Sequence, residues 1–179
     1  MLTKLWEHLK ALVVPDRGLP LDKQFFQGLC LIGGVLTLTV VVPVNHVQHM
    51  SPWVNRVVLP FGLELLALAW FARRGRYLKG TAFLSILVGL DLVWFPNGGS
   101  QGSIGLYFFT AALYLVVFFK GRVRIGAFVL LIANIIALHF AERAWPELVH
   151  TFEGSDRLLD VLTGYLVSML TCALMLWVV

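Results

Sequence analysis

The strongest constraint on the fold is a series of apolar runs, most of them long enough to cross a membrane, separated by short polar segments. A membrane-spanning helix needs about 20 predominantly apolar residues. Inside lipid, backbone N–H and C=O groups are satisfied only in helices or closed barrels. The runs cover residues 25–44, 57–72, 80–95, 106–119, 125–144 and 161–179. The sequence therefore predicts an all-α fold, a six-span transmembrane helical bundle.

Composition supports this prediction and limits what else the chain can contain. Hydrophobic residues make up 59% of the chain and charged residues only 13%, about half the charged fraction of an ordinary soluble domain. Within 179 residues, six spans leave no room for a separate soluble domain. The lipid bilayer is the expected partner, and no nucleic-acid partner is expected from the net charge of +4, because the placement of the basic residues already has a topological explanation.

The N-terminal segment has a different pattern from the spans. Apolar residues at Leu2, Leu5, Leu9 and Val13 fall on one helical face, which is typical of a short amphipathic helix lying on a membrane surface. Residues 1–24 are predicted to form a cytoplasmic interfacial segment, and residues 25–179 the six-helix transmembrane domain. Because the last run has no basic flank, we expect the domain to be truncated before a cytoplasmic output domain.

The basic residues divide unevenly between the two ends of the predicted bundle. Of the 14 Lys and Arg residues, all but Arg56, Arg143 and Arg157 fall on the side that holds both chain ends. Short basic loops stay in the cytoplasm. This pattern predicts a multi-pass protein of the bacterial inner membrane with both termini cytoplasmic. Trp53, Trp94 and Trp145 are expected at the outer border, where tryptophan rings favour the interface.

Two segments carry a resemblance to a known family. They are WFPNGGSQGSIGLYFF at residues 94–109 and the stretch from Glu142 to Asp160, which contains Pro146, Leu148, Val149 and Arg157. Together they resemble the membrane-embedded input module of certain bacterial histidine kinases. The pattern departs from the family at two positions, where Pro96 displaces the aromatic residue before the turn and Ser103 replaces a proline after it.

The resemblance implies a function for the chain and for its missing continuation. It implies a sensory input domain that relays an extracytoplasmic or membrane-borne signal through its last span. The full-length protein is then expected to be a homodimer, with a histidine kinase as the anticipated output, whereas this chain has no catalytic domain and is not itself an enzyme. It also favours Asn97, Ser100 and Arg157 as residues of the ligand-binding site.

Ionisable side chains inside the predicted spans are the other candidates for that site. Glu64, Asp91, His139 and Glu142 all fall in the outer half of the bundle. Charged groups at such depth usually face the interior or a wet cavity and pair with one another. We expect Glu64, Asp91 and His139 to line one cavity beneath the turn 97–105, where an unknown small-molecule or lipid-like signal binds. The same groups could equally form a structural hydrogen-bond network.

Other site types are less well supported by the residues. The sequence HVQH with His150 could in principle gather around a metal ion, but no metal site is predicted, and no cofactor can be named. The turn NGGSQGSIG lacks the terminal Gly-Lys-Ser/Thr of a phosphate-binding loop. Glu153, Asp156, Arg157 and Asp160 have helical spacing and are expected to form solvated surface pairs. Gly28, Gly33 and Gly34 are expected to permit close helix packing.

Two other functions stay open. A weak similarity between RYLKGTAFL and GRVRIGAFVL, together with Glu64 and Asp91, is compatible with a small transporter or channel. The third is an assembly or scaffold protein without a ligand.

Overall fold

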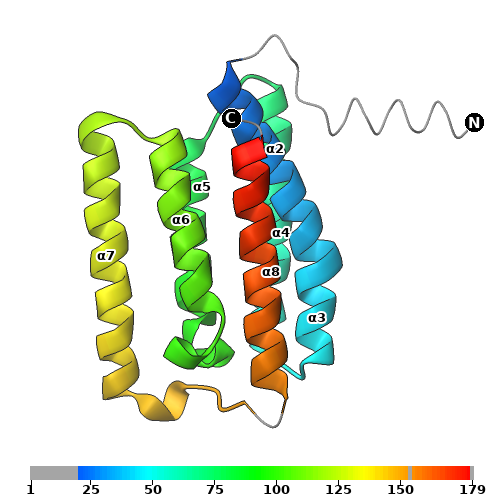
Figure 1. Cartoon of the computed structure of the whole chain (residues 1–179), viewed down its shortest axis with the longest axis vertical. Coiled ribbons are helices and arrows are strands. Elements are labelled where there is room, and N and C mark those ends of the chain that lie inside the picture. The colour runs from blue at the N-terminus through cyan, green and yellow to red at the C-terminus, as the bar shows by residue number, and fades with distance from the viewer. Residues whose placement is uncertain (1–19, 153–154, 178–179) are drawn as a thin grey trace, which may run out of the picture.

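The described part of the chain consists of helices joined by short turns and loops. The computed structural model describes residues 20–152 and 155–177, and these residues contain no strand (Figure 1). The predicted all-α fold is confirmed for this part. The amphipathic pattern at residues 2–13 lies outside the described residues, as do Glu153 and the last two residues of the sixth predicted run.

The described part of each predicted run falls on one helix or one continuous helical segment, except that Phe119, the last residue of the fourth run, lies just beyond the end of α6. The elements are α2 (Leu21–Leu36), the π-helix η1 (Thr37–Val41), α3 (Val42–Val47), α4 (Pro52–Arg73), α5 (Lys79–Trp94), the 3₁₀ turns η2 (Phe95–Asn97) and η3 (Gly99–Gln101), α6 (Ile104–Phe118), α7 (Gly121–Ala144), the 3₁₀ turn η4 (Pro146–Leu148) and α8 (Asp156–Trp177). Among the described residues, four segments are long and apolar enough to cross a membrane, namely Leu21–Val47, Pro52–Arg73, Lys79–Asn97 and Gly121–Ala144. Ile104–Phe118 is apolar but shorter, and α8 has 22 residues. Length and composition thus support four crossings directly.

The first helical segment is widened in its second half. The helix α2 passes into η1 and then α3 without a break. Pro43 lies two residues after the end of η1 and has no N–H to donate to the carbonyl of Thr39, which its ring also crowds. A π-type turn before Pro43 is the local solution to this conflict.

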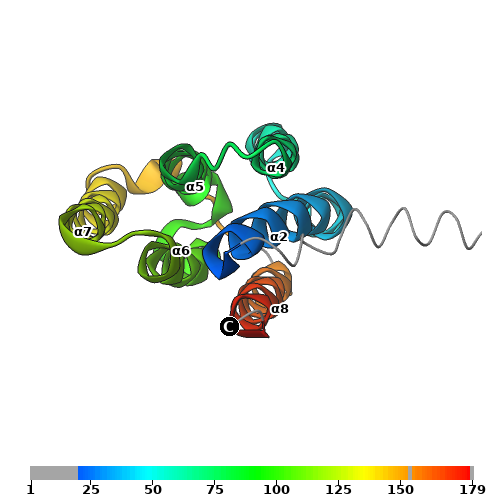
Figure 2. The same cartoon turned by 90° about the horizontal axis from the view of Figure 1, so that it is seen from above.

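Three helices, α4, α6 and α8, pack against α2. Seen along the bundle, α2 lies between α4 and α8 with α6 beside it, and α7 lies at the far edge next to α5 and α6 (Figure 2). The closest approach is between α2 and α4. A Cβ on Gly34 would come 2.8 Å from Leu66 Cδ2, and one on Gly62 would come 2.8 Å from Leu38 Cδ2. The packing role predicted for Gly34 is confirmed, whereas Gly28 has no neighbour within 4 Å of an added Cβ.

The two ends of the bundle differ in their loops. The start of α2, the loops before α5 and α7, and the end of α8 share one end (Figure 1). At this end Lys79 Nζ lies 2.7 Å from Asp22 Oδ2. The turn between α5 and α6 and the loop containing η4 share the other end (Figure 1). The basic loops around Arg74 and Arg122 therefore lie opposite the glycine-rich turn.

Candidate functional site

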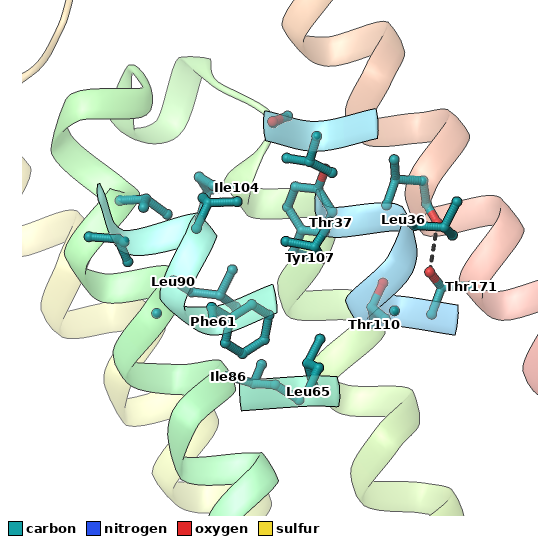
Figure 3. Close-up of a pocket in the computed structure, with 18 of the residues that line it drawn as sticks. Leu36, Thr37, Phe61, Leu65, Ile86, Leu90, Ile104, Tyr107, Thr110 and Thr171 are labelled. Carbon is teal, nitrogen blue, oxygen red and sulfur yellow. Dashed lines mark hydrogen bonds between the residues drawn. The ribbon is translucent and has the colours of Figure 1, made fainter. Parts of the chain in front are cut away.

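A cavity of about 190 Å³ lies among α2, η1, α3, α4, α5, α6 and α8. Figure 3 is a close-up of this cavity, to which Phe61, Leu65, Ile86, Leu90 and Ile104 contribute apolar side chains. Thr37, Tyr107, Thr110 and Thr171 contribute hydroxyl groups (Figure 3). The cavity is mainly apolar with a few polar groups, which is typical of small-molecule sites.

The end of the cavity beside the glycine-rich turn is polar. Five buried polar residues, each 3–6% exposed, line it: Asn45, Gln48, Asn97, Ser103 and Asp160. Gln27 is the one other buried polar residue among those described, and it does not line the cavity. Buried polar side chains are costly unless they are hydrogen-bonded. Their concentration at one place makes this end the candidate functional site.

The centre of this polar end is a cluster of Asn97, Ser103 and Asp160, which we call the Asp160 node. The Asp160 carboxylate accepts hydrogen bonds from Ser103 N at 2.7 Å and from Ser103 Oγ at 2.8 Å. Asn97 Nδ2 lies 3.3 Å and 3.4 Å from the two carboxylate oxygens. Asp160 is 4% exposed.

The helix α6 explains how a carboxylate can be buried without a cation. Ser103 is the N-cap of α6, but its own side chain forms no capping hydrogen bond. Asp160, from α8, accepts hydrogen bonds from the backbone N–H and the hydroxyl of this N-cap residue, and it lies near the positive end of the α6 dipole. One side chain thereby joins α8 to the start of α6.

A single face of α8 forms its wall of the cavity. Asp160, Thr163, Val167 and Thr171 line the cavity, and their spacing of three or four residues places them on one helical face. Thr163 Oγ1 also accepts a hydrogen bond of 3.4 Å from Gln48 Nε2. Gly164 lets α8 approach the node, because a Cβ there would come 2.5 Å from Ser103 Cβ. An occupant of the polar end of the cavity therefore lies beside α8.

The turn above the node needs its glycines. Gly98 and Gly99 have φ values of 81° and 56°, which L side chains rarely adopt. A Cβ on Gly98 would overlap the ring of Phe152, and one on Gly99 would come 2.6 Å from Glu142 Oε2. The turn is thus packed between α7 and the loop before α8.

A second carboxylate holds the same turn from α7. Glu142 accepts hydrogen bonds from Ser100 N at 2.9 Å, Ser100 Oγ at 2.7 Å and Trp94 Nε1 at 3.0 Å. Two of the predicted site residues, Ser100 and Glu142, are therefore brought together. Trp94 is 1% exposed, so its predicted place at the interface is wrong. It is buried because Glu142 offers its indole N–H an acceptor inside the bundle.

The predicted convergence of Glu64, Asp91 and His139 on one cavity is not found. Glu64 accepts a short hydrogen bond from Ser85 Oγ, and Asp91 accepts one of 2.7 Å from Asn134 Nδ2. His139 packs beside the Trp94 ring at 5.2 Å between centroids. None of the three lines the cavity. Each group has a neighbour on its own or an adjacent helix, and these local contacts replace the expected meeting of three ionisable groups.

The last predicted helix contains another difference. Arg157 is exposed, whereas Asp160 is buried, so the expectation of solvated surface pairs is wrong for Asp160. Asp160 is buried because it lies almost one turn further along α8 than Arg157 and faces the start of α6. Asn97 is the predicted site residue that reaches the cavity, and the node adds Ser103 and Asp160.

The predicted site did not include Asp160 and Ser103, and only Asp160 had a feature in the sequence that pointed to it. Asp160 is the last ionisable residue before the final apolar run, and such positions within or beside spans are often functional. Ser103 had no comparable signal, because its role depends on a partner 57 residues away.

The histidines do not gather into a metal site in the part of the chain that the structure covers. His46 and His49 are exposed, and no group of three His, Cys, Asp or Glu residues among those described could hold a metal ion.

Comparison of the chain with protein families, curated proteins and solved structures found no match.

Proposed function

We propose that this chain is a six-span sensory input module of the bacterial inner membrane, which relays an extracytoplasmic or membrane-borne signal through α8. The observation that carries the proposal is the position of α8. One face of this helix forms a wall of the cavity, and Asp160 on the same face holds it to the start of α6. A signal that occupies the cavity can therefore change the packing of α8.

Six crossings with both termini cytoplasmic are part of this proposal. The predicted runs of α6 and α8 lie alongside the four helices that are long and apolar enough to span (Figure 2). The basic loops lie at one end of the bundle and the glycine-rich turn at the other (Figure 1). The positive-inside rule then directs the turn and the Asp160 node outward.

In this proposal, the signal is relayed when the hydrogen bonds that join Asp160 on α8 to Ser103 and Asn97 are weakened. Within the described residues, α8 packs mainly against α6 and α2. A ligand beside Asp160 competes with Ser103 and Asn97 for the carboxylate, so α8 can shift relative to α6. A ligand moves such an equilibrium only if it binds the two arrangements with different affinities, and the direct contact with α8 provides that difference.

The movement of α8 can be measured with pairs of spin labels in a variant that lacks both cysteines. Labels at Phe109→Cys on α6 and Tyr165→Cys on α8 report on the proposed movement, because both native side chains are exposed. Labels at Leu63→Cys on α4 and Leu84→Cys on α5, also exposed, form the control pair. Asp160→Asn weakens the node, and we expect it to shift or broaden the α6–α8 distance distribution and to leave the α4–α5 distribution unchanged. An unchanged α6–α8 distribution contradicts a relay through α8.

A homodimeric histidine kinase as the full-length protein is proposed from the sequence resemblance. Two segments carry that resemblance, the turn 97–102 and the stretch from Glu142 to Asp160. They are joined by the hydrogen bonds from Asn97 to Asp160 and from Ser100 to Glu142. Single cysteines at exposed α8 positions such as Leu162, Leu166 and Met169 should cross-link in the full-length protein with a helical period. A uniform yield along α8 argues against dimerisation through this helix.

A small transporter is the second candidate function, and the π-helix favours it. The segment Thr37–Val41 departs from regular α-helix, both of these residues line the cavity, and π-type turns are frequent at functional sites. A transporter exposes its cavity alternately to both sides of the membrane. Labelling of a single cysteine at Thr37 from both sides by a small impermeant thiol reagent favours transport, whereas labelling from the outer side alone favours sensing.

A further inference from the structure

We propose that the cavity binds an amphiphile with a hydrogen-bond donor as its head, either a hydroxyl or an ammonium group, on a medium-length alkyl chain. The head lies at the Asp160 node and the chain extends towards Cys30. This inference deepens the proposed function and rests on it for its biological meaning, because it names the class of signal that the module receives.

The negative charge and the hydrogen-bond acceptors at the polar end of the cavity favour a particular head group on the ligand. Asp160 supplies a carboxylate, and the described lining of the cavity contains no Lys, Arg or His. Asn97 and Gln48 add side-chain carbonyl oxygens, for which no hydrogen bond within the described residues is recorded. A group that donates hydrogen bonds fits these acceptors, and a positive charge is favoured further. A carboxylate head is repelled by Asp160, since no cation is present to compensate for two like charges.

The length, lining and volume of the cavity favour an alkyl chain as the rest of the ligand. Ser103 and Tyr114, both on the cavity wall, are eleven residues apart along α6, and a rise of 1.5 Å per residue makes the cavity roughly 16 Å long. The wall also contains the apolar side chains of Leu36, Phe61 and Leu90 (Figure 3). A volume of about 190 Å³ exceeds that of an engineered apolar cavity of ~150 Å³ that binds benzene. A long, narrow and largely apolar space of this size suits a single alkyl chain.

Cys30 provides a built-in reporter of occupancy. It lies at the inner end of the cavity wall and is 1% exposed. The other cysteine, Cys172, can be replaced by alanine so that Cys30 is the single thiol. In the full chain in lipid nanodiscs, the rate of modification by N-ethylmaleimide then measures access to Cys30 through the cavity.

The experiment compares octan-1-ol, octylamine and octanoate, which share one chain and differ in the head. We expect octan-1-ol and octylamine to slow modification of Cys30 about fivefold at a free concentration about four times their Kd, by mass action, and octanoate to have no effect. The variant Asp160→Asn distinguishes the two donor heads. It should abolish protection by octylamine, which needs the charge, and preserve part of the protection by octan-1-ol.

Two glycine variants distinguish binding in the cavity from general effects of the compounds on the bilayer. Gly89 lines the cavity, and an added Cβ there meets only Phe61, at 3.7 Å, so Gly89→Leu fills the space. Gly126 on α7 is exposed and has no neighbour within 4 Å of an added Cβ, so Gly126→Leu is the matched control. Protection should disappear in Gly89→Leu and persist in Gly126→Leu. The thermal unfolding midpoint of the same samples gives a second readout if Cys30 reacts too slowly, and the alcohol and amine should raise it in Gly126→Leu relative to Gly89→Leu.

The outcomes separate this inference from the proposed function. Equal protection by octanoate overturns the donor-head assignment, and the absence of both protection and a rise in the unfolding midpoint with every compound overturns the ligand site. Protection by octan-1-ol without any change in the α6–α8 spin-label distance supports the ligand site, while it contradicts sensing through α8.

Discussion

Asp160 holds together two helices that are far apart in the sequence. Its carboxylate accepts hydrogen bonds from Ser103, at the start of α6, and from Asn97 in the turn, although it belongs to α8. A buried donor that loses its partner costs about 1–3 kcal/mol. The stability of the end of the bundle that holds the glycine-rich turn should therefore depend on this one side chain.

Asp160→Ala tests this dependence. We expect it to lower the free energy of unfolding by about 1–3 kcal/mol, because Ser103 N and Asn97 Nδ2 lose their acceptor. Arg157→Ala on the same helix is the control, since Arg157 is exposed and surface changes usually stay within about 0.5 kcal/mol. Reversible unfolding in detergent measures both. Equal effects of the two variants are incompatible with a structural node at Asp160.

The glycines allow a second test at the residue scale. Gly98 and Gly75 have nearly the same φ, 81° and 82°, but an added Cβ overlaps Phe152 only at Gly98. Both alanine variants lose about 1–2 kcal/mol from the left-handed conformation, and Gly98→Ala should lose about 1–3 kcal/mol more from overpacking. Thermal unfolding of the two variants measures the difference. A similar loss for both means that Phe152 does not pack on the turn.

The candidate site was only partly predictable from the residues. Asn97, Ser100 and Glu142 were identifiable because a glycine-rich turn and an ionisable group near a span end both have sequence signals. The pairing of Glu64 with Ser85 and of Asp91 with Asn134 was not, because depth in the membrane does not reveal which side of a helix meets which neighbour. Asp160 looked like a surface residue for the same reason.

At the scale of elements, helix positions were readily predicted and helix ends were not. The apolar runs predicted all six helical segments, but α2 begins four residues before the predicted run, at Leu21, and continues with η1 and α3 to Val47. The polar residues at these ends belong to the helices because Asp22 binds Lys79 and Asn45 binds Asn55. Such partners lie on other helices and have no local signature.

The contact between α2 and α4 gives a prediction for a helix pair. Gly34→Leu should destabilise the protein by about 1–3 kcal/mol, because its side chain would push against Leu66 and the backbone of Gly62. Gly28→Leu on the same helix has open space and should be neutral or slightly stabilising, since leucine favours helix more than glycine does. Thermal unfolding in the same detergent compares them. Loss of stability only in Gly28→Leu contradicts the close packing of these helices.

For the whole molecule, the two ends of the bundle have separate roles in this account. The outer end holds the Asp160 node, the turn and the polar end of the cavity, and the inner end holds the basic loops and the end of α8. These roles follow from the proposal that the chain crosses the membrane six times in this orientation. The ligand site and the relay both depend on it.

Labelling with a membrane-impermeant thiol reagent in intact cells tests this claim most directly. In a variant without Cys30 and Cys172, single cysteines are placed at Gln101 in the turn and at Arg122 in a basic loop, both of which are exposed. We expect the cysteine at position 101 to react in intact cells and the cysteine at position 122 to react only after the membrane is permeabilised. Labelling of both positions from the same side, or in the opposite order, contradicts the six-span topology.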